Sequence, residues 1–408
     1  MAAMISTSAT SRLLDTAGTL DLERVRARFP ALAPSPDGRR IVHADAPGGT
    51  QVTSGVIEAM SAYLRDHNAN SHGGFATSAA TDTMVEGVRT AVASFLGGWD
   101  DGIVFGQNMT TLTWHLSHAL DARVSSGDEL VVTRLDHDAN ISPWLHLAKR
   151  TGASLRWVDL DPATGRLHLD TLAVSARTRL VAFPAASNAL GTVVDPAPFV
   201  DAARRVGALT FCDAVHAAPH VPLSQRDDGI DVLACSPYKF FGPHAGVLSA
   251  DPSLLAELQP DKVRPAPDDG PDRWQTGTAT FEAIAGIGAA LDHITDVGMD
   301  AIGAHEQSLS RRFLDGLSGL AAVTLHGPPN AAERTPTFAV TVRGHSPAQV
   351  AAHLADRDIY CWAGHYYALE PMRALGLLHD GGAVRIGFVH YHGATDVDRV
   401  LQALADLG

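Results

Sequence analysis

Residues 236–243 read Ser-Pro-Tyr-Lys-Phe-Phe-Gly-Pro, which places Lys239 between an apolar run and a Gly-Pro turn. The apolar run, Val232–Cys235, is expected to be a buried strand, and a second such run, Leu209–Cys212, ends at Asp213. A lysine held between a buried strand and a turn loses solvation, which lowers its pKa and makes its amine a nucleophile.

A nucleophilic lysine and an aspartate at the end of a core strand together indicate a pyridoxal phosphate (PLP) site. The lysine would form the covalent link to the cofactor, and the aspartate would hold the protonated pyridine nitrogen. The alternative is a solvated lysine in a turn and an aspartate that caps the next helix. These two residues alone leave both interpretations open, and the rest of the chain favours the first.

Composition narrows the class of protein. The chain has 408 residues, of which 45% are hydrophobic and 19% charged, as is typical of a globular protein with room for two domains. The formal net charge of −14 leaves no basic excess, so neither nucleic acid nor an anionic membrane is expected as a partner. No apolar run reaches membrane-spanning length, and no basic and apolar signal segment is found at the start.

The cysteines and histidines point to a reduced compartment without a metal centre. Cys212, Cys235 and Cys361 lie in or beside apolar runs and lack CxxC spacing, so neither a disulfide framework nor a zinc site is expected. The twenty histidines are scattered, and no metal is predicted. We therefore expect a cytoplasmic protein that acts on a small molecule.

Apolar strands alternate with helical patterns from about residue 100 to 250, which indicates an α/β fold with a mostly parallel sheet covered on both faces. Short strands at Thr337–Val342 and Val384–Gly387 suggest a smaller α+β domain after a boundary near residues 285–295. The strands predicted for the main sheet are Ile103–Phe105, Glu129–Thr133, Leu155–Val158, Thr178–Phe183, Leu209–Cys212, Val232–Cys235 and Gly246–Ser249, and the helices between them are Thr110–Leu120, Ser142–Thr151 and Ala197–Val206.

Four segments are expected along the chain. Residues 1–20 are rich in Ala, Ser and Thr and are predicted to be a flexible leader. Residues 21–45 are predicted to pack with the small domain, residues 46–288 to form the large PLP-binding domain, and residues 289–408 to form the small C-terminal domain.

Polar residues follow several of the predicted strands. Because ligands of parallel sheets bind at the carboxyl ends of the strands, these groups are expected to converge on one edge. They belong to short motifs that occur in order along the chain: Gly106–Thr111, Asp136–Asn140, Ser187–Thr192, Asp213–His216, Ser236–Lys239, Gln275–Thr278 and Ala383–Gly387.

In these motifs the chain resembles the fold-type I, class V PLP-dependent enzymes of the cysteine desulfurase and selenocysteine lyase group, from about residue 41 to 405. The resemblance implies a large domain with a seven-stranded sheet and a homodimer with sites at the subunit interface. It also implies roles for the motif residues. Asn108, Met109 and Thr110 at a helix start would bind the phosphate, and His137 would stack on the pyridine ring.

The resemblance assigns the remaining cofactor contacts in the same way. Asn188 and His216 would bond the 3′-oxygen, with Asn188 also able to reach the substrate carboxylate. Ser236 would bind the phosphate, where Tyr238 replaces the usual histidine but still offers a hydrogen-bond donor. Thr278 would reach the phosphate of the neighbouring subunit.

Two further segments concern the substrate. Arg385 would bind the substrate α-carboxylate, because a planar guanidinium suits a bidentate contact. Desulfurases carry a persulfide-forming cysteine in a loop of the pattern Arg-x-Gly-His-His-Cys-Ala. Here Trp362 and Tyr367 stand at the arginine and cysteine positions. His365, Tyr366 and Tyr367 would protonate the leaving sulfur or shape an aromatic pocket for an S-substituent.

We therefore expect catalysis by Lys239, Asp213 and His137, and a β-elimination C–S lyase acting on cysteine or an S-substituted cysteine. A class V aminotransferase or an amino-acid epimerase like the isopenicillin N epimerases remains the alternative, since all three reactions begin at Cα–H. A non-catalytic PLP-binding protein is a remote third interpretation.

Overall fold

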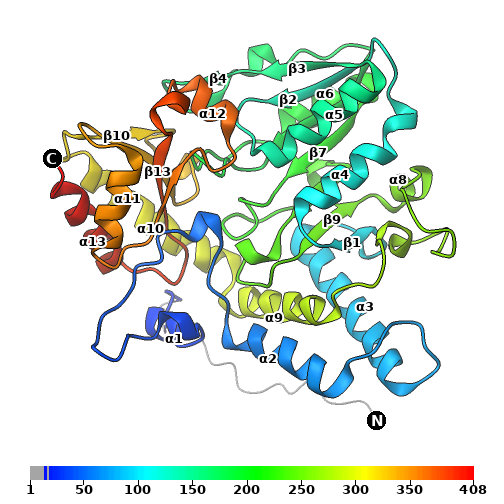
Figure 1. Cartoon of the computed structure of the whole chain (residues 1–408), viewed down its shortest axis with the longest axis horizontal. Helices are drawn as coiled ribbons and strands as arrows, with labels where there is room; N and C mark the ends of the chain where they lie inside the picture. The colour runs from blue at the N-terminus through cyan, green and yellow to red at the C-terminus, as the bar shows by residue number, and fades with distance from the viewer. Residues whose placement is uncertain (1–12, 16–17) are drawn as a thin grey trace.

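The computed structural model of the protein describes residues 13–15 and 18–408 (Figure 1). A seven-stranded sheet forms its centre. Its strands are β1 (Ile103–Gly106), β2 (Glu129–Thr133), β3 (Ser154–Val158), β6 (Thr178–Pro184), β7 (Leu209–Asp213), β8 (Val232–Cys235) and β9 (Gly246–Ala250).

The order of these strands across the sheet is β1-β9-β8-β7-β6-β2-β3. The five strands from β8 to β3 pair in parallel, whereas β9 is antiparallel to both of its neighbours, β1 and β8. The predicted α/β fold with a mostly parallel sheet is thus confirmed. Every residue of β2, β8 and β9 is buried, as continuous apolar runs in a doubly covered sheet require.

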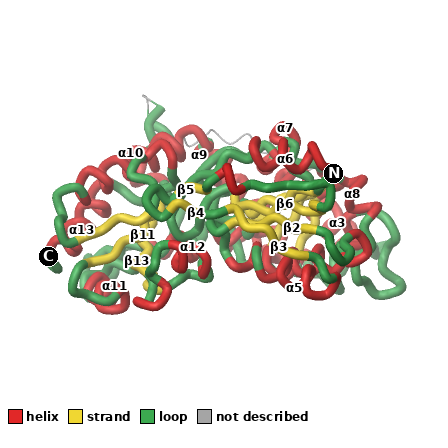
Figure 2. The backbone as a smooth tube through the Cα atoms, turned by 90° about the horizontal axis from the view of Figure 1, so that it is seen from above, coloured by secondary structure: helices red, strands yellow, loops and turns green. Residues whose placement is uncertain are grey.

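Helices cover both faces of the sheet, as the view in Figure 2 shows for α5 (Ser142–Thr151) and α6 (Ala197–Val206). Phe199 of α6 stacks on Phe183 of β6, with ring centroids 4.7 Å apart. On the other face, Trp144 of α5 meets Phe211 of β7 edge to face at 5.1 Å. Two apolar layers therefore hold the central strands in place.

The C-terminal part of the chain is a smaller α+β unit, as predicted. Its antiparallel sheet has the strand order β10-β11-β13-β12 and packs against three helices. These elements are β10 (Val323–His326), β11 (Thr337–Val342), β12 (Trp362–Gly364), β13 (Ala383–Gly387), α10 (Met299–Leu317), α11 (Pro347–Ala355) and α13 (Ala394–Ala405).

The remaining longer elements connect or flank these two units. They are α1 (Leu22–Arg26), α2 (Ser54–Ala62), α3 (Ala76–Leu96), α4 (Met109–Ala119), β4 (Leu160–Asp161), β5 (Arg166–Leu167), α7 (Gln225–Asp228), α8 (Pro252–Glu257), α9 (Phe281–Val297) and α12 (Leu369–Ala374). No helix within the described ranges is long and apolar enough to cross a bilayer.

The predicted segments can be compared with the elements that the structure places at their boundaries. Helix α9 runs without a break through residues 285–295, where the domain boundary is expected. In the N-terminal segment, Asp45 forms a bridge to Gly387 of β13. Of the predicted leader, residues 1–12 and 16–17 lie outside the described residues, whereas Leu13 and Leu20 are buried in the core.

Candidate active site

A cavity of about 780 Å³ opens where the carboxyl ends of the parallel strands meet the C-terminal unit. Segments from both units contribute to its wall, so most of the predicted site residues come together in one place. Those that line it are Met109, Thr110, His137, Asn188, Asp213, His216, Ser236, Tyr238, Lys239, His365, Tyr367 and Arg385.

Lys239 lies in a single helical turn, Pro237–Lys239, directly after β8, and its side chain is buried. Its Nζ donates a hydrogen bond to the carbonyl oxygen of Pro47. Burial, together with the positive charge of Arg385, holds the pKa of Lys239 well below its ordinary value. A neutral amine is the form that attacks a carbonyl carbon, so Lys239 is suited to covalent chemistry.

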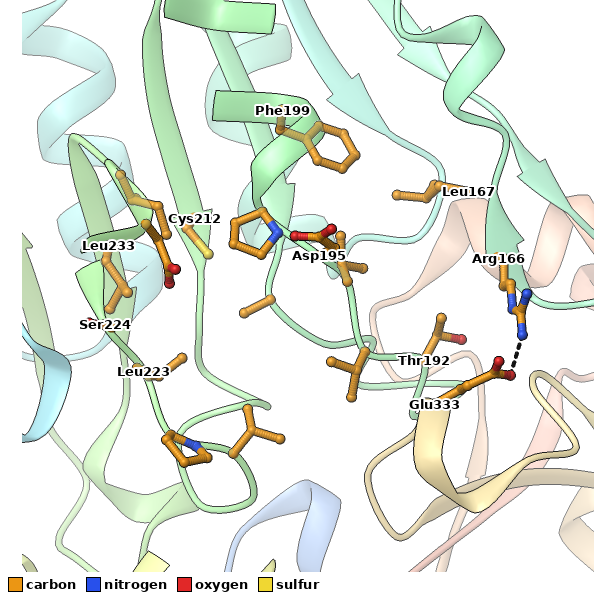
Figure 3. A pocket seen from close by; sticks show the side chains of 18 of the residues that line it. Arg166, Leu167, Thr192, Asp195, Phe199, Cys212, Leu223, Ser224, Leu233 and Glu333 are labelled. Carbon is orange, nitrogen blue, oxygen red and sulfur yellow. Dashed lines mark ion pairs between the residues drawn. The ribbon is translucent and has the colours of Figure 1, made fainter. Parts of the chain in front are cut away.

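Asp213 ends β7 and accepts a hydrogen bond from the backbone N–H of Val215 at 2.9 Å. Burial raises the pKa of its carboxyl group to about 6. The preceding residue, Cys212, points to the opposite face of the sheet because side chains alternate along a strand. Cys212 lines a second cavity of about 520 Å³, shown in Figure 3, so its thiol is not part of the site around Lys239.

His137 is positioned by a turn that follows β2. Asp136 is fully enclosed and accepts hydrogen bonds from Thr133 Oγ1 at 2.5 Å and from Asn140 Nδ2 at 2.7 Å. These bonds fix the turn beneath His137. Burial lowers the pKa of His137 to about 3, so its ring faces the cavity as a neutral imidazole.

Arg385 on β13 is held from two sides. Its Nη1 donates to the carbonyl oxygen of Asn188 at 3.0 Å, and its guanidinium lies 4.5 Å from the centroid of the Tyr366 ring. Asn188 Nδ2 in turn donates to the carbonyl oxygen of Tyr366 at 3.0 Å. Burial lowers the pKa of Arg385 to about 10, which leaves it charged at neutral pH. The sequence did not predict that Tyr366 contacts Arg385 and Asn188 in this way.

The start of α4 faces the cavity from the side of Ser236. The backbone N–H of Met109 donates to Ser236 Oγ at 3.3 Å, and the side chain of Tyr238 stacks on His244 at 5.2 Å between ring centroids. The positive end of the helix dipole favours an anion here.

Two predicted site residues lie away from this wall. Asn108 caps α4, because its Oδ1 accepts a hydrogen bond from the backbone N–H of Thr111 at 2.9 Å. Thr278 lines a separate cavity of about 560 Å³ together with Gln107 and His244. The structure of one chain therefore does not bring Thr278 to Lys239.

An aromatic loop forms the mouth of the cavity. Tyr366 and Tyr367 both have positive φ, 52° and 57°, which is rare for residues with bulky side chains. The Tyr367 ring lies 5.6 Å from that of His137, and the backbone N–H of Asp138 donates to the carbonyl oxygen of Tyr367 at 2.7 Å. The loop is thereby attached to the His137 turn.

Trp362 lies at the start of the same loop and is half exposed, at 52%. Its indole covers Gly48 so closely that a Cβ atom at position 48 would collide with the indole nitrogen. Trp114 also lines the cavity, so the large aromatic side chains of Trp114, Trp362 and Tyr367 all contribute to its wall.

Cys361 precedes this loop but does not belong to the cavity wall. Its side chain packs against the core of the C-terminal unit, and burial raises the pKa of the thiol to about 12. Since a thiolate is the nucleophilic form of cysteine, such a thiol is poorly reactive.

The residues present fit PLP with an amino acid substrate. The cavity combines a buried amine, a buried carboxyl group and helix N–H groups that suit a phosphate. Asn188 Oδ1 and Arg385 Nε find no hydrogen-bond partner among the described residues, although both atoms are buried. Unpaired buried polar atoms are costly, so a polar ligand is the expected partner.

Comparisons with known proteins agree with this geometry. The family model described as "Aminotransferase class-V" matches residues 42–400. "Probable cysteine desulfurase 2" of Mycobacterium leprae is 32% identical over 95% of this chain and 98% of its own length. "Aminotransferase-like protein FGM3" of Gibberella zeae is 31% identical over 95% of this chain and 99% of its own length.

Among solved structures, the apo structure of a cysteine desulfurase from Thermococcus onnurineus NA1 is similar, with a TM-score of 0.88 and 27% identity. The match covers 94% of this chain and 97% of that one. The fold is therefore shared with this enzyme over most of the chain.

Proposed function

Because the chain belongs to the class-V aminotransferase family of PLP-dependent enzymes, and to its cysteine desulfurase-like group, we propose that it cleaves a carbon–sulfur bond of an amino acid. The proposed substrate is cysteine or an S-substituted cysteine, and the proposed reaction is β-elimination. The observation that carries this proposal is that none of the three cysteines, all within the described residues, lines the cavity around Lys239.

The proposed cofactor contacts are those that the family's motifs imply; apart from Asn108 and Thr278, these residues line the cavity around Lys239. Lys239 holds PLP covalently, Asp213 pairs with the pyridine nitrogen and His137 stacks on the ring. His216 and Asn188 bond the 3′-oxygen. The phosphate is bound by Asn108, Met109, Thr110, Ser236 and Tyr238, with Thr278 reaching it from the other subunit.

In the proposed reaction, Arg385 holds the substrate carboxylate and Lys239 removes the proton from Cα. When bound, PLP supplies an electron sink for bond cleavage at that carbon. The Cβ–S bond breaks, and His365 or Tyr367 protonates the departing thiolate. With one water, the substrate becomes a thiol, pyruvate and ammonia.

Tyr367 is the residue that separates elimination from desulfuration. A desulfurase needs a thiolate that attacks the substrate sulfur and carries it as a persulfide. A phenol does not carry sulfur in this way. A tyrosine at this place can still donate a proton, which is what a leaving thiolate requires.

The aromatic entrance supports a substituted cysteine over free cysteine. The rings of Trp114, Trp362 and Tyr367 line the cavity, and Arg385 already serves the carboxylate in this proposal. Aromatic rings bind apolar groups through large contact areas, so an apolar S-substituent fits this entrance.

The second candidate is transamination or epimerisation, which begins with the same proton transfer by Lys239. The similarity to a protein named aminotransferase-like favours keeping it. Transamination would leave the substrate side chain on a 2-oxo acid, and epimerisation would yield the D-amino acid.

We further propose that the protein is a cytoplasmic homodimer. Each chain is divided into four segments, residues 1–20, 21–45, 46–288 and 289–408. The location of Thr278 in a cavity apart from Lys239 supports a role across a subunit interface. The three unpaired cysteines suit a reducing compartment.

The test is a product assay by mass spectrometry. The holoenzyme is incubated with L-cysteine and a panel of S-alkyl and S-aryl cysteines, with Lys239→Ala as the inactive control. We expect pyruvate, ammonia and the free thiol in equal amounts. Alanine with released sulfur would overturn β-elimination in favour of desulfuration.

A further inference from the structure

A cluster of buried polar side chains lies directly behind the cavity. His216 belongs to the cavity wall, whereas His220 and Glu306 lie deeper, with 6% and 2% of their surfaces exposed. Neither His220 nor Glu306 has a part in the proposed reaction, so their burial needs another explanation.

The geometry links the two units of the protein. After β7 the chain makes a tight helical turn, in which Ala218 N–H bonds to Ala214 O at 2.9 Å, and this turn brings His216 and His220 together. Their ring centroids are 5.3 Å apart at an interplanar angle of 62°. His220 Nδ1 lies 2.8 Å from Glu306 Oε2 on α10, a helix of the C-terminal unit.

His216 is also contacted from a second side. Its Nε2 lies 3.1 Å from Thr335 Oγ1, and Thr335 precedes β11 of the C-terminal unit. The His220 ring and the Thr335 hydroxyl thus restrict the imidazole from two directions. Nδ1 of His216 is the ring nitrogen that remains for a ligand in the cavity.

The cost of the His220–Glu306 pair argues against a purely stabilising role. Glu306 Oε1 has no hydrogen-bond partner among the described residues, and burial raises the pKa of this carboxyl group. Apolar side chains of similar volume usually stabilise a core at least as well as a buried ion pair does. The His220–Glu306 pair is better explained by a role in orienting a neighbouring side chain.

We propose that His220 and Glu306 are positioning residues that hold the His216 ring in place for the cofactor. This inference rests on the proposed function, in which His216 donates a hydrogen bond to the 3′-oxygen of PLP. Glu306 fixes His220, and His220 fixes the edge of His216, so the C-terminal unit orients a group that the central sheet supplies.

The experiment is a pH titration of the visible absorbance of the holoenzyme. His220→Asn places an amide nitrogen near the position of Nδ1, so Glu306 keeps a donor while His216 loses the adjacent ring. A donor to the 3′-oxygen stabilises its deprotonated form, and loosening that donor raises the midpoint. We expect the midpoint to rise by at least about half a pH unit, roughly three-fold in proton affinity.

Other ionisable groups act on this cluster, so all variants are compared in one buffer series on the same background. These groups are Lys239, Arg385, His305, His390 and Tyr391.

Two further variants complete the test. Glu306→Leu removes the acceptor and should shift the midpoint in the same direction, whereas Glu306→Gln keeps an acceptor oxygen and should stay close to the wild type. The matched control is His326→Asn, the same change at a histidine away from the cluster, whose Nε2 lies 3.0 Å from Thr341 Oγ1.

An unchanged midpoint in folded His220→Asn would overturn the inference, as would an equal shift in His326→Asn. If Glu306→Leu does not fold, His220→Asn decides alone. Absence of visible absorbance in the wild-type protein would instead count against the proposed function, so the two failures are distinguishable.

Discussion

The guanidinium carbon of Arg385 lies over the ring of Tyr366, 4.5 Å from its centroid, and Tyr366 itself comes from the loop that lines the cavity. The carbonyl oxygens of Asn188 and Tyr366 complete the arrangement through hydrogen bonds from Arg385 and Asn188. The residue proposed to bind the substrate carboxylate is therefore oriented by the loop that also frames the entrance.

Arg385→Ala should raise the KM for amino acids by roughly 10- to 100-fold, the loss expected for a hydrogen bond to a charged group. Its PLP content should change much less. Steady-state kinetics and the absorbance of the purified variant measure the two quantities. An unaltered KM would show that the carboxylate binds elsewhere.

Tyr366→Leu should raise the KM by about 5- to 30-fold, because it removes a cation–π contact while leaving Arg385 in place. Tyr366→Phe keeps the ring and is the matched control, with a KM near that of the wild type. Equal effects of both changes would assign the role to the hydroxyl, which donates to the carbonyl oxygen of Ala383.

Lys239→Ala should abolish the visible absorbance of bound PLP and all turnover. The side chain is the buried amine of the cavity, and the lowering of its pKa by burial favours the neutral, nucleophilic form. Lys149→Ala, at an exposed position on α5, is the control and should behave as the wild type. A yellow Lys239→Ala protein with unchanged absorbance would exclude the proposed covalent link.

Cys361→Ser should leave the rate of product formation within about two-fold of the wild type. The thiol lies outside the cavity wall, and burial raises its pKa to about 12. Product formation is followed with L-cysteine and with the best S-substituted substrate. Loss of activity with L-cysteine alone would indicate a persulfide route through this residue.

Glu129→Gln should destabilise the fold by about 2 kcal/mol at pH 7, because a paired carboxylate is replaced by a neutral amide. Hydrogen bonds from Arg156, Ser175 and Arg177 lower the pKa of Glu129 from 4.5 to about 2. Its contribution is therefore complete above pH 4.5 and is lost as the pH falls toward 2.

Urea unfolding at pH 7 and pH 3.5 gives the free energy of unfolding of the wild type and of Glu129→Gln. The difference between the two proteins should be smaller at pH 3.5. Glu257→Gln is the control, since the side chain of Glu257 is 62% exposed. If the difference in free energy of unfolding between the wild type and Glu129→Gln is the same at both pH values, Glu129 is not the titrating group.

Local patterns allowed much of the fold to be predicted. Buried parallel strands read as continuous apolar runs, so β2, β7 and β8 could be placed within one residue. Their carboxyl ends then indicated where Asp213 and Lys239 would converge. The boundary expected near residues 285–295 falls within helix α9, which the structure shows continuous there.

Contacts between distant segments could not be predicted. Asn188 and Tyr366 are 178 residues apart, and His220 and Glu306 are 86 apart. A single buried polar pair leaves no periodic pattern in a sequence, because it depends on how two units pack. The supporting residues around the site were missed for this reason, whereas the groups at strand ends were found.

The indole of Trp362 packs directly on Gly48, although the two residues are more than three hundred positions apart in the sequence. A substitution at one of these positions therefore affects the other. A side chain at position 48 would require the indole of Trp362 to move away from this contact. Enzymes of this family that differ at one of these positions should differ at the other as well. Within the family, the two positions together then serve as a recognisable signature of this type of entrance.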